Sequence, residues 1–184
     1  MKQDLAAYIG QGLRDLNPFF QWKVQNNSNR QTVEVLVSFR IDLEDKAPGI
    51  QDQFGTTLNT NYLQFEDVIA FYDPIQSDIQ PDNYLRAIPF DNTLGIDRGQ
   101  VDVTLKHLNR VLSAGKTDLK DFVQDSQRHD FHLNWDQHNL DQALETAKSL
   151  DRFGQDKLFM DFEKHESLIK TFTEGKQNDG VERI

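Results

Sequence analysis

Hydrophobic and polar residues alternate most regularly between residues 32 and 43. The apolar odd positions of this stretch are Val33, Val35, Val37, Phe39, Ile41 and Leu43. Most even positions are polar, with Leu36 as the exception. A period of two residues is typical of a strand with one buried and one solvated face, whereas strands of parallel sheets show continuous apolar runs. The pattern therefore predicts an antiparallel sheet that is covered on one face.

Four other segments have the composition of strands. Residues 20–24 alternate, and the polar stretch 26–29 that follows them predicts a hairpin with the valine-rich strand. Residues 63–72 and 84–90 complete a meander, and residues 131–135 form a fifth strand. Pro89 removes a donor from the ladder, so we expect the fourth strand to end there or to lie at an edge.

Apolar residues at helical spacing predict helices before and after these strands. The first helix spans residues 2–16 and stops at Asn17-Pro18. Asp97 is the expected N-cap of a helix that ends at Gly115. Thr117 is the expected N-cap of a second, short helix that ends at residue 123. Asp136 caps the next helix, and a last one covers residues 158–172.

The expected order is therefore one helix, four strands, two helices, one strand and two helices. This order predicts an α+β fold of two layers, in which helices cover one face of a mainly antiparallel meander sheet of about five strands. We expect residues 1–172 to form a single domain and the polar residues 173–184 to form a disordered tail.

Composition narrows the class of protein. The 184 residues include no cysteine, which excludes disulfides, thiol nucleophiles and cysteine metal ligands. The chain has no apolar run long enough to span a bilayer and no signal-peptide pattern at its start. We therefore expect a cytoplasmic protein that does not associate with membranes.

The formal net charge of -10 is concentrated in one part of the chain. Residues 31–100 hold twelve acidic and four basic side chains, a sum of -8. In a meander, the ends of the second and fourth strands and the start of the third lie at one edge of the sheet. The predicted acidic rim at this edge consists of Asp42, Glu44, Asp45, Asp52, Glu66 and Asp91. Such a rim is either a solvated surface or a docking site for a cationic partner or divalent ion.

Motifs for nucleic acids and cofactors are missing from the sequence. No window combines clustered Lys and Arg with aromatic residues, so we expect no binding to nucleic acid. Gly10-Gln11-Gly12 lacks the third glycine of a dinucleotide site and lies inside a helix. The chain contains neither a Walker loop nor a Gly-x-Ser-x-Gly elbow. We therefore predict no cofactor and no catalytic residue.

One cluster keeps an enzymatic alternative open. Its potential metal ligands are His129, His132, Asp136 and His138. In a strand, the first two histidines would point to opposite faces, so they could share a metal only if His129 lay in a turn. The alternative function is a metal-assisted hydrolase that uses this cluster.

The strand at residues 63–72 is apolar at both parities. This indicates either a central strand that is covered on both sides or an apolar patch used by a second chain, with a homodimer as the leading version.

Three blocks in this order resemble a known family. They are residues 65–74, residues 84–90 with Gly95, and residues 131–136. Over residues 1–150 the sequence is similar to the DUF3013 family, short proteins of unknown function from Firmicutes, notably lactic acid bacteria. The resemblance implies a bacterial cytoplasmic protein and assigns no catalytic residue. The predicted element order is also similar to that of small acidic secretion chaperones, which implies a dimeric protein-binding module by analogy of fold.

Taken together, these features predict a non-enzymatic, acidic module that binds another protein through its sheet or its rim. Chaperone-like, adaptor and immunity proteins all fit this description.

Overall fold

The valine-rich strand lies inside a four-stranded sheet in the computed structural model, which describes residues 2–43, 62–125 and 130–162. The strands, in their spatial order, are β2 (Gln21–Asn27), β3 (Thr32–Asp42), β4 (Tyr62–Tyr72) and β5 (Arg86–Pro89). The first three are antiparallel, as predicted, and Val35 pairs with Ile69 at the centre of the sheet. The odd residues of β3 from 33 to 41 are all buried, which confirms the inner face.

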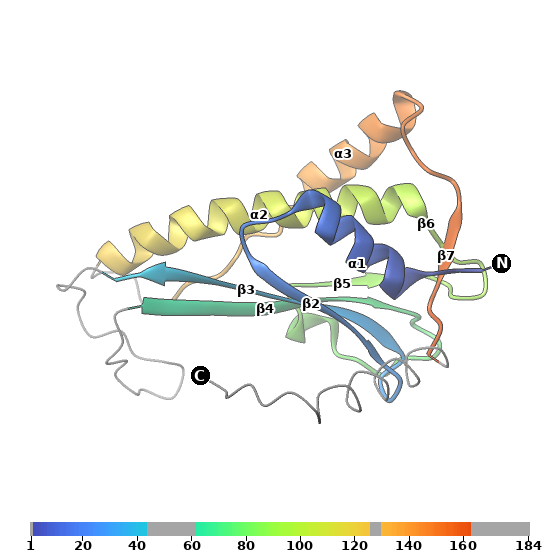
Figure 1. Cartoon of the computed structure of the whole chain (residues 1–184), viewed down its shortest axis with the longest axis horizontal. Helices are drawn as coiled ribbons and strands as arrows, with labels where there is room; N and C mark the ends of the chain where they lie inside the picture. Colours follow the sequence, from blue (N-terminus) through green and yellow to red (C-terminus); the bar gives the residue numbers. More distant parts are fainter. Residues whose placement is uncertain (1, 44–61, 126–129, 163–184) are drawn as a thin grey trace, which may run out of the picture.

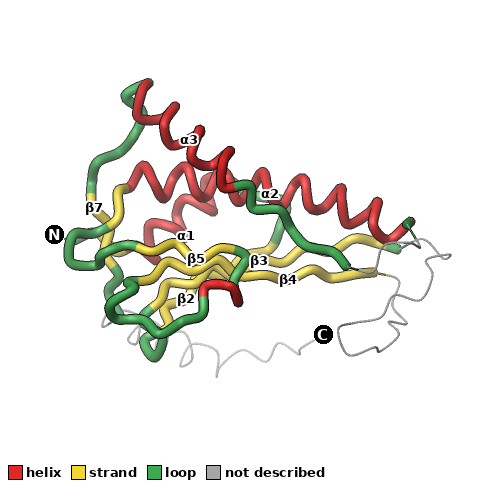
Figure 2. Tube along the Cα trace, turned by 180° about the vertical axis from the view of Figure 1, so that it is seen from behind, coloured by secondary structure: helices red, strands yellow, loops and turns green. Residues whose placement is uncertain are grey.

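The helices lie in two tiers on this inner face (Figures 1 and 2). The helices are α1 (Leu5–Leu16), α2 (Arg98–Gln124) and α3 (Gln137–Ser149). The first two pack against the sheet, while α3 rests on the outer side of α2. The α+β class is therefore confirmed, with a third layer that the sequence did not predict.

Part of the outer face is covered as well. Thr32 and Glu34 of β3 have even numbers, yet both are buried. The Glu34 carboxylate accepts hydrogen bonds from Gln25 at 2.9 Å, from Thr32 at 3.1 Å and from the Tyr84 hydroxyl at 3.4 Å. Tyr84 belongs to the segment between β4 and β5, which includes the 3-10 helix η1 (Pro81–Asn83) and lies on the outer side (Figure 1). Along β3, residues 40 and 42 of this face are exposed as predicted.

The predicted meander is wrong at its last step. β5 pairs with β4 in parallel, because residues 73–85 carry the chain back along the sheet before β5 begins. Pro89 ends this edge strand, as predicted. The neighbours β3 and β5 make β4 a central strand, which favours the covered-strand interpretation over an apolar patch.

Gly115 does not end a helix. The two helices predicted on either side of it are one helix, α2. A Cβ atom at Gly115 would lie 2.0 Å from Leu133 Cδ2, so this glycine gives room to a neighbouring side chain. A glycine that serves packing and a glycine that stops a helix look alike in sequence.

The predicted fifth strand is absent from the described residues. Residues 130–135 have no regular secondary structure, although Trp135 is buried and His132 is exposed, as the alternation requires. Alternation predicts which side of a segment is buried, but it does not show that a neighbouring strand is present to form the hydrogen bonds of a sheet.

The helix predicted from residue 158 is also wrong where the structure describes it. Residues Lys157–Phe159 form β7, which lies between β1 (Gln3–Asp4) and β6 (Ile96–Asp97) in a second sheet. Strands of two or three residues are too short for a periodic signal. The predicted tail lies outside the described residues, and the single domain over residues 1–172 stays a prediction.

We expect Gly115→Ala to lower the free energy of unfolding by about 1–3 kcal/mol, because the methyl group would overlap Leu133. Gly10→Ala in α1 is the matched control, since the nearest atom to its Cβ is 3.9 Å away. The control should stabilise the protein by about 0.5–1 kcal/mol through helix propensity. Urea denaturation measures both, and equal effects would contradict the packing role of Gly115.

Candidate functional site

A well of about 820 Å³ lies between α2, α3 and the chain that follows α3. In Figure 1, α3 begins beside α2 and rises away from it, and the following segment descends to β7 near the start of α2. The lining comes from residues 99–118 of α2, from residues 134–147 and from Leu150 and Arg152. We call this site the α2–α3 well.

A buried histidine lines the well where α3 leaves α2. His107 of α2 is 4% exposed, and its ring meets that of Trp135 edge-on, with the centroids 4.8 Å apart. Its Nε2 atom is hydrogen-bonded to the Trp135 carbonyl oxygen, which requires the proton on Nε2. Asp136 follows and caps α3, as predicted, by accepting from the Asn139 backbone N–H at 3.1 Å. These contacts fix the point where α3 leaves α2.

Hydrogen bonds at the start of α2 hold the chain that follows α3 and connect α2 to α1. The backbone N–H of Gly99 donates to the Gly154 carbonyl oxygen at 2.8 Å, and a Cβ at Gly99 would lie 2.7 Å from the Gly154 nitrogen. Tyr8 of α1 donates its hydroxyl proton to Asp102 at 2.6 Å and accepts from Arg98 Nε at 2.9 Å. Burial raises the pKa of Tyr8, and its hydrogen bond to Asp102 raises it further.

The charged side chains of the well differ in how they are paired. Asp102 and Asp136 accept the internal hydrogen bonds described above. Lys106, Arg110 and Arg152 make no ion pair or side-chain hydrogen bond with any residue in the described ranges. The lining therefore carries three cations without a described ion-pair partner and three carboxylates, Asp102, Asp118 and Asp136, so its formal charges sum to zero.

The structure does not bring the predicted metal ligands together. His132 and His138 are exposed, and His138 Nε2 lies 3.0 Å from Gln142 Nε2. Asp136 lines the well but caps α3, and His129 lies outside the described residues. Across residues 2–43, 62–125 and 130–162, no three His, Asp or Glu side chains are placed to hold a metal ion.

The predicted acidic rim is divided between two ends of the sheet. Asp42 and Glu66 lie on the outer face at one end, four register positions apart, which is about 13 Å. Asp91 follows β5, which runs parallel to β4, so it lies at the opposite end beside Tyr72. The Thr93 hydroxyl and backbone N–H donate to Asp91 and lower its pKa. Glu44, Asp45 and Asp52 lie outside the described residues.

The carboxylate of Asp67 lies on the inner face of the sheet, which the sequence analysis did not predict. Asp67 pairs with Val37, on the same face of β4 as Phe65 and Ile69. Burial raises the pKa of Asp67, although the backbone N–H of Val68 donates to it at 2.8 Å. Perturbed carboxyls often mark functional sites, but Asp67 is not among the residues that line the well.

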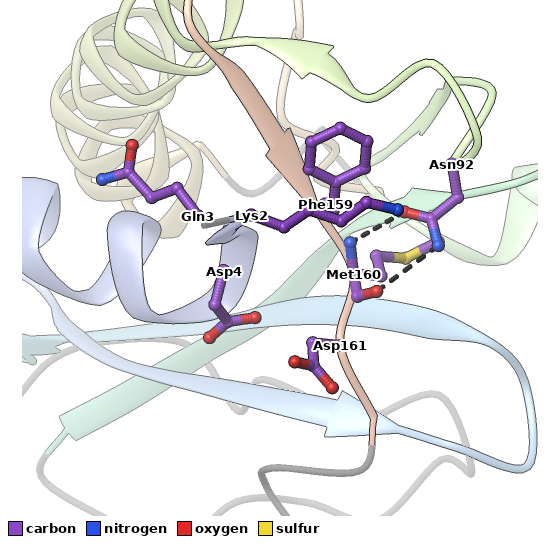
Figure 3. A pocket seen from close by; sticks show the side chains of 7 residues that line it. All are labelled: Lys2, Gln3, Asp4, Asn92, Phe159, Met160 and Asp161. Carbon is purple, nitrogen blue, oxygen red and sulfur yellow. Dashed lines mark hydrogen bonds between the residues drawn. The ribbon is translucent and has the colours of Figure 1, made fainter.

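A smaller cavity of about 220 Å³ lies where β1 meets β7 (Figure 3). The Asn92 side chain accepts from the Met160 backbone N–H at 2.8 Å and donates to the Met160 carbonyl oxygen at 3.4 Å. The Lys2 ammonium lies 4.6 Å from the centre of the Phe159 ring. These contacts hold β7 in place, so we assign the cavity a structural role.

Over residues 1–164 the sequence matches the family described as "Protein of unknown function (DUF3013)". The chain belongs to the DUF3013 family. The crystal structure of a conserved protein of unknown function from Enterococcus faecalis is similar to this DUF3013 chain, with a TM-score of 0.70 and 20% sequence identity. The match covers 86% of this chain and 96% of that one, and at this identity it concerns the fold alone. No curated protein matches the sequence.

The family resemblance inferred from three blocks is thereby confirmed.

Within the described residues, no helix is both long and apolar enough to cross a membrane.

Sequence reasoning missed the well, although a signal for it exists. Val103, His107, Val111 and Gly115 recur every four residues, beside the stripe that faces the sheet. A helix with two such stripes has to be covered on two sides. The second stripe of α2 predicts a partner for its outer side, and α3 is that partner.

We expect His107→Ala to lower the free energy of unfolding by about 2–4 kcal/mol, because it removes a buried ring and a hydrogen bond to the Trp135 carbonyl. His132→Ala, at an exposed position three residues from Trp135, should change it by less than about 0.5 kcal/mol. Chemical denaturation compares the two variants. Similar losses would show that His107 does not hold α3.

We expect Asp67→Asn to stabilise the protein more at about pH 7 than at about pH 4. The fold favours the protonated carboxyl, so stability is lost as the pH rises through the raised pKa, and asparagine does not ionise. Glu66→Gln removes a carboxylate from the exposed face of the same strand as a control. Melting temperatures across this range test the difference, and a gain independent of pH would refute it.

Proposed function

We propose that this chain is a non-enzymatic, acidic module that binds another protein, and that the α2–α3 well is its binding surface. The observation that carries the proposal is the well itself. It is a concave site between two helices, and it combines apolar side chains with three cations that have no ion-pair partner among the described residues and with three carboxylates. Chaperone-like, adaptor and immunity proteins need such a surface and no catalytic group.

The exposed surface of α3 and its small side chains support this proposal. Leu140 is the buried residue of α3, and most of the helix surface is exposed. Ala143 and Ala147 line the well with small side chains, so a partner's backbone could approach closely. Leu150 at its lip is 55% exposed. Exposed apolar residues that are rimmed by polar ones are typical of protein interaction sites.

The metal-assisted hydrolase has less support. The described members of its cluster do not converge, and Asp136 already accepts the hydrogen bond that caps α3. Thermal stabilisation by Mn²⁺ or Zn²⁺ that disappears in His132→Ala would favour that alternative, because a ligand that binds the native state raises its stability.

A photo-crosslinking residue at Thr146, inside the well, tests the proposal in the native host. Its neighbour Glu145 is exposed but does not line the well, so a crosslinker there is the matched control. We expect one protein to be crosslinked from position 146 and not from position 145. Gln142→Trp, which places a bulky side chain in the well, should abolish the adduct. Equal labelling from both positions would contradict the proposal.

A further inference from the structure

β2 is an edge strand of the four-stranded sheet, and β3 is its one partner among the described strands. Its register with β3 is continuous from Gln21 to Asn27, with neither a bulge nor a proline. About half of the N–H and C=O groups of an edge strand point away from its partner. Within the described ranges, no backbone hydrogen bond joins β2 to an element other than β3. In this part of the chain, β2 therefore offers an open hydrogen-bonding edge, beside which α1 packs (Figure 1).

The apolar inner face of the sheet continues to this edge. Trp22 and Val24 of β2 pair with Val37 and Val35 of β3, which are buried. Trp22 and Val24 pack against the core as well, but they are only half-buried. A further strand that pairs with β2 would cover both side chains, and the burial of apolar surface would add to the backbone hydrogen bonds.

The opposite edge of the sheet is short and blocked. β5 has four residues and ends at Pro89, which has no N–H to donate. A chain with one open edge can pair with a second copy of itself about a two-fold axis, and the assembly then stops at two chains. Two open edges would instead allow pairing to continue from chain to chain.

The distribution of charge favours the β2 edge for contact between two copies. Residues 1–30, which include α1 and β2, hold four basic and two acidic side chains, a sum of +2. Since the whole chain sums to -10, the remaining residues sum to -12. Two copies of an acidic chain repel each other least across the part that has no negative net charge.

We infer that β2 forms an antiparallel pair with β2 of a second copy, with Trp22 at the two-fold axis. In this register the two Trp22 side chains lie opposite each other on the inner face. Lys23 lies opposite Gln21 of the second copy on the outer face. The two sheets then form one continuous sheet, with the helices of both copies on the same side. This surface is separate from the α2–α3 well, so the inference does not depend on the proposed function.

Two observations select this register. A pair centred on Lys23 would place two ammonium groups opposite each other, and like charges directly opposite destabilise a sheet. A pair centred on Val24 would place Trp22 opposite Asn26 of the second copy. The Asn26 side chain already donates to the Asp161 carbonyl oxygen at 3.1 Å, so the chain that follows β7 occupies this end of β2.

Sedimentation equilibrium of the full chain over a range of concentrations tests the inference, and we expect a reversible dimer. Gln21→Lys places an ammonium group opposite Lys23 of the second copy, a contact that occurs twice, and should raise the Kd of the dimer about threefold or more. Gln21→Glu places a carboxylate there and should lower the Kd. Both shifts are the reverse of a net-charge effect, because an added lysine reduces the repulsion between two acidic chains.

Gln76→Lys is the matched control. Gln76 is exposed in the turn after β4, so this variant changes the net charge as Gln21→Lys does but leaves the β2 edge unchanged. It should lower the Kd by less than about twofold, because salt screens charges that lie far from the contact.

Tryptophan fluorescence gives a second measurement. The chain has two tryptophans, and Trp135 is 7% exposed, so quenching by iodide reports chiefly on Trp22. We expect the quenching to weaken as the dimer forms, and to weaken less in Gln21→Lys at the same concentration. Quenching that does not change with dimerisation would overturn the inference.

Three other results would also overturn it and show how the edge is used. A dimer that responds alike to Gln21→Lys, Gln21→Glu and Gln76→Lys forms through another surface. A chain that stays monomeric at millimolar concentration does not pair through β2. In such a monomer, slow hydrogen exchange of the β2 amides that point away from β3 would mean that another segment of this chain covers the edge. Fast exchange of these amides would leave the edge to a different protein.

Discussion

The burial of one face of β3 and β4 beneath α2 is the interaction on which the rest of the structure depends. Val35 and Ile69 pair at the centre of the sheet with 0% exposure, and Leu108 and Leu112 of α2 are equally buried. Each such side chain contributes about 1.5–3 kcal/mol when it leaves water. α1 extends the same core through Ile9. This layer fixes the position of α2, and α2 in turn supports α3.

The well follows from the two sides of α2. One side faces the sheet, and the other carries His107 and Gly115, which hold the chain at Trp135 and Leu133. α3 touches the rest of the molecule mainly through α2. α3 is attached to α2 near its start, and the chain that follows it returns to the start of α2 (Figure 2). The α2–α3 well lies between these segments. The exposed side chains that line it, such as Lys106, Gln142 and Thr146, can serve binding at little cost to folding.

Several Asp carboxylates accept hydrogen bonds from nearby backbone N–H groups instead of pairing with Lys or Arg. Asp73 is 2% exposed and accepts from the backbone N–H groups of Ile75 and Asn92, which joins two loops. Asp91 and Asp136 hold turns and caps in the same way. Carboxylates that accept backbone N–H bonds are less available to neighbouring cations. The three carboxylates and three cations that line the well are therefore not paired with one another, although their formal charges sum to zero.

The sequence by itself determined the α+β class, the first helix and its stop at Asn17, the β2–β3 hairpin, the buried face of β3 and the Asp136 cap. Each of these depends on residues that are close in the chain, where spacing and capping chemistry act directly. The tertiary structure alone decided the parallel β5, the continuous α2, the unpaired course of residues 130–135 and the strand β7. It also separated Asp91 from Asp42 and joined Lys106 and Arg152 around one well. These features depend on contacts between segments that are distant in the chain. An alternating pattern predicts which side of a segment is buried, but it does not predict which other segment covers that side.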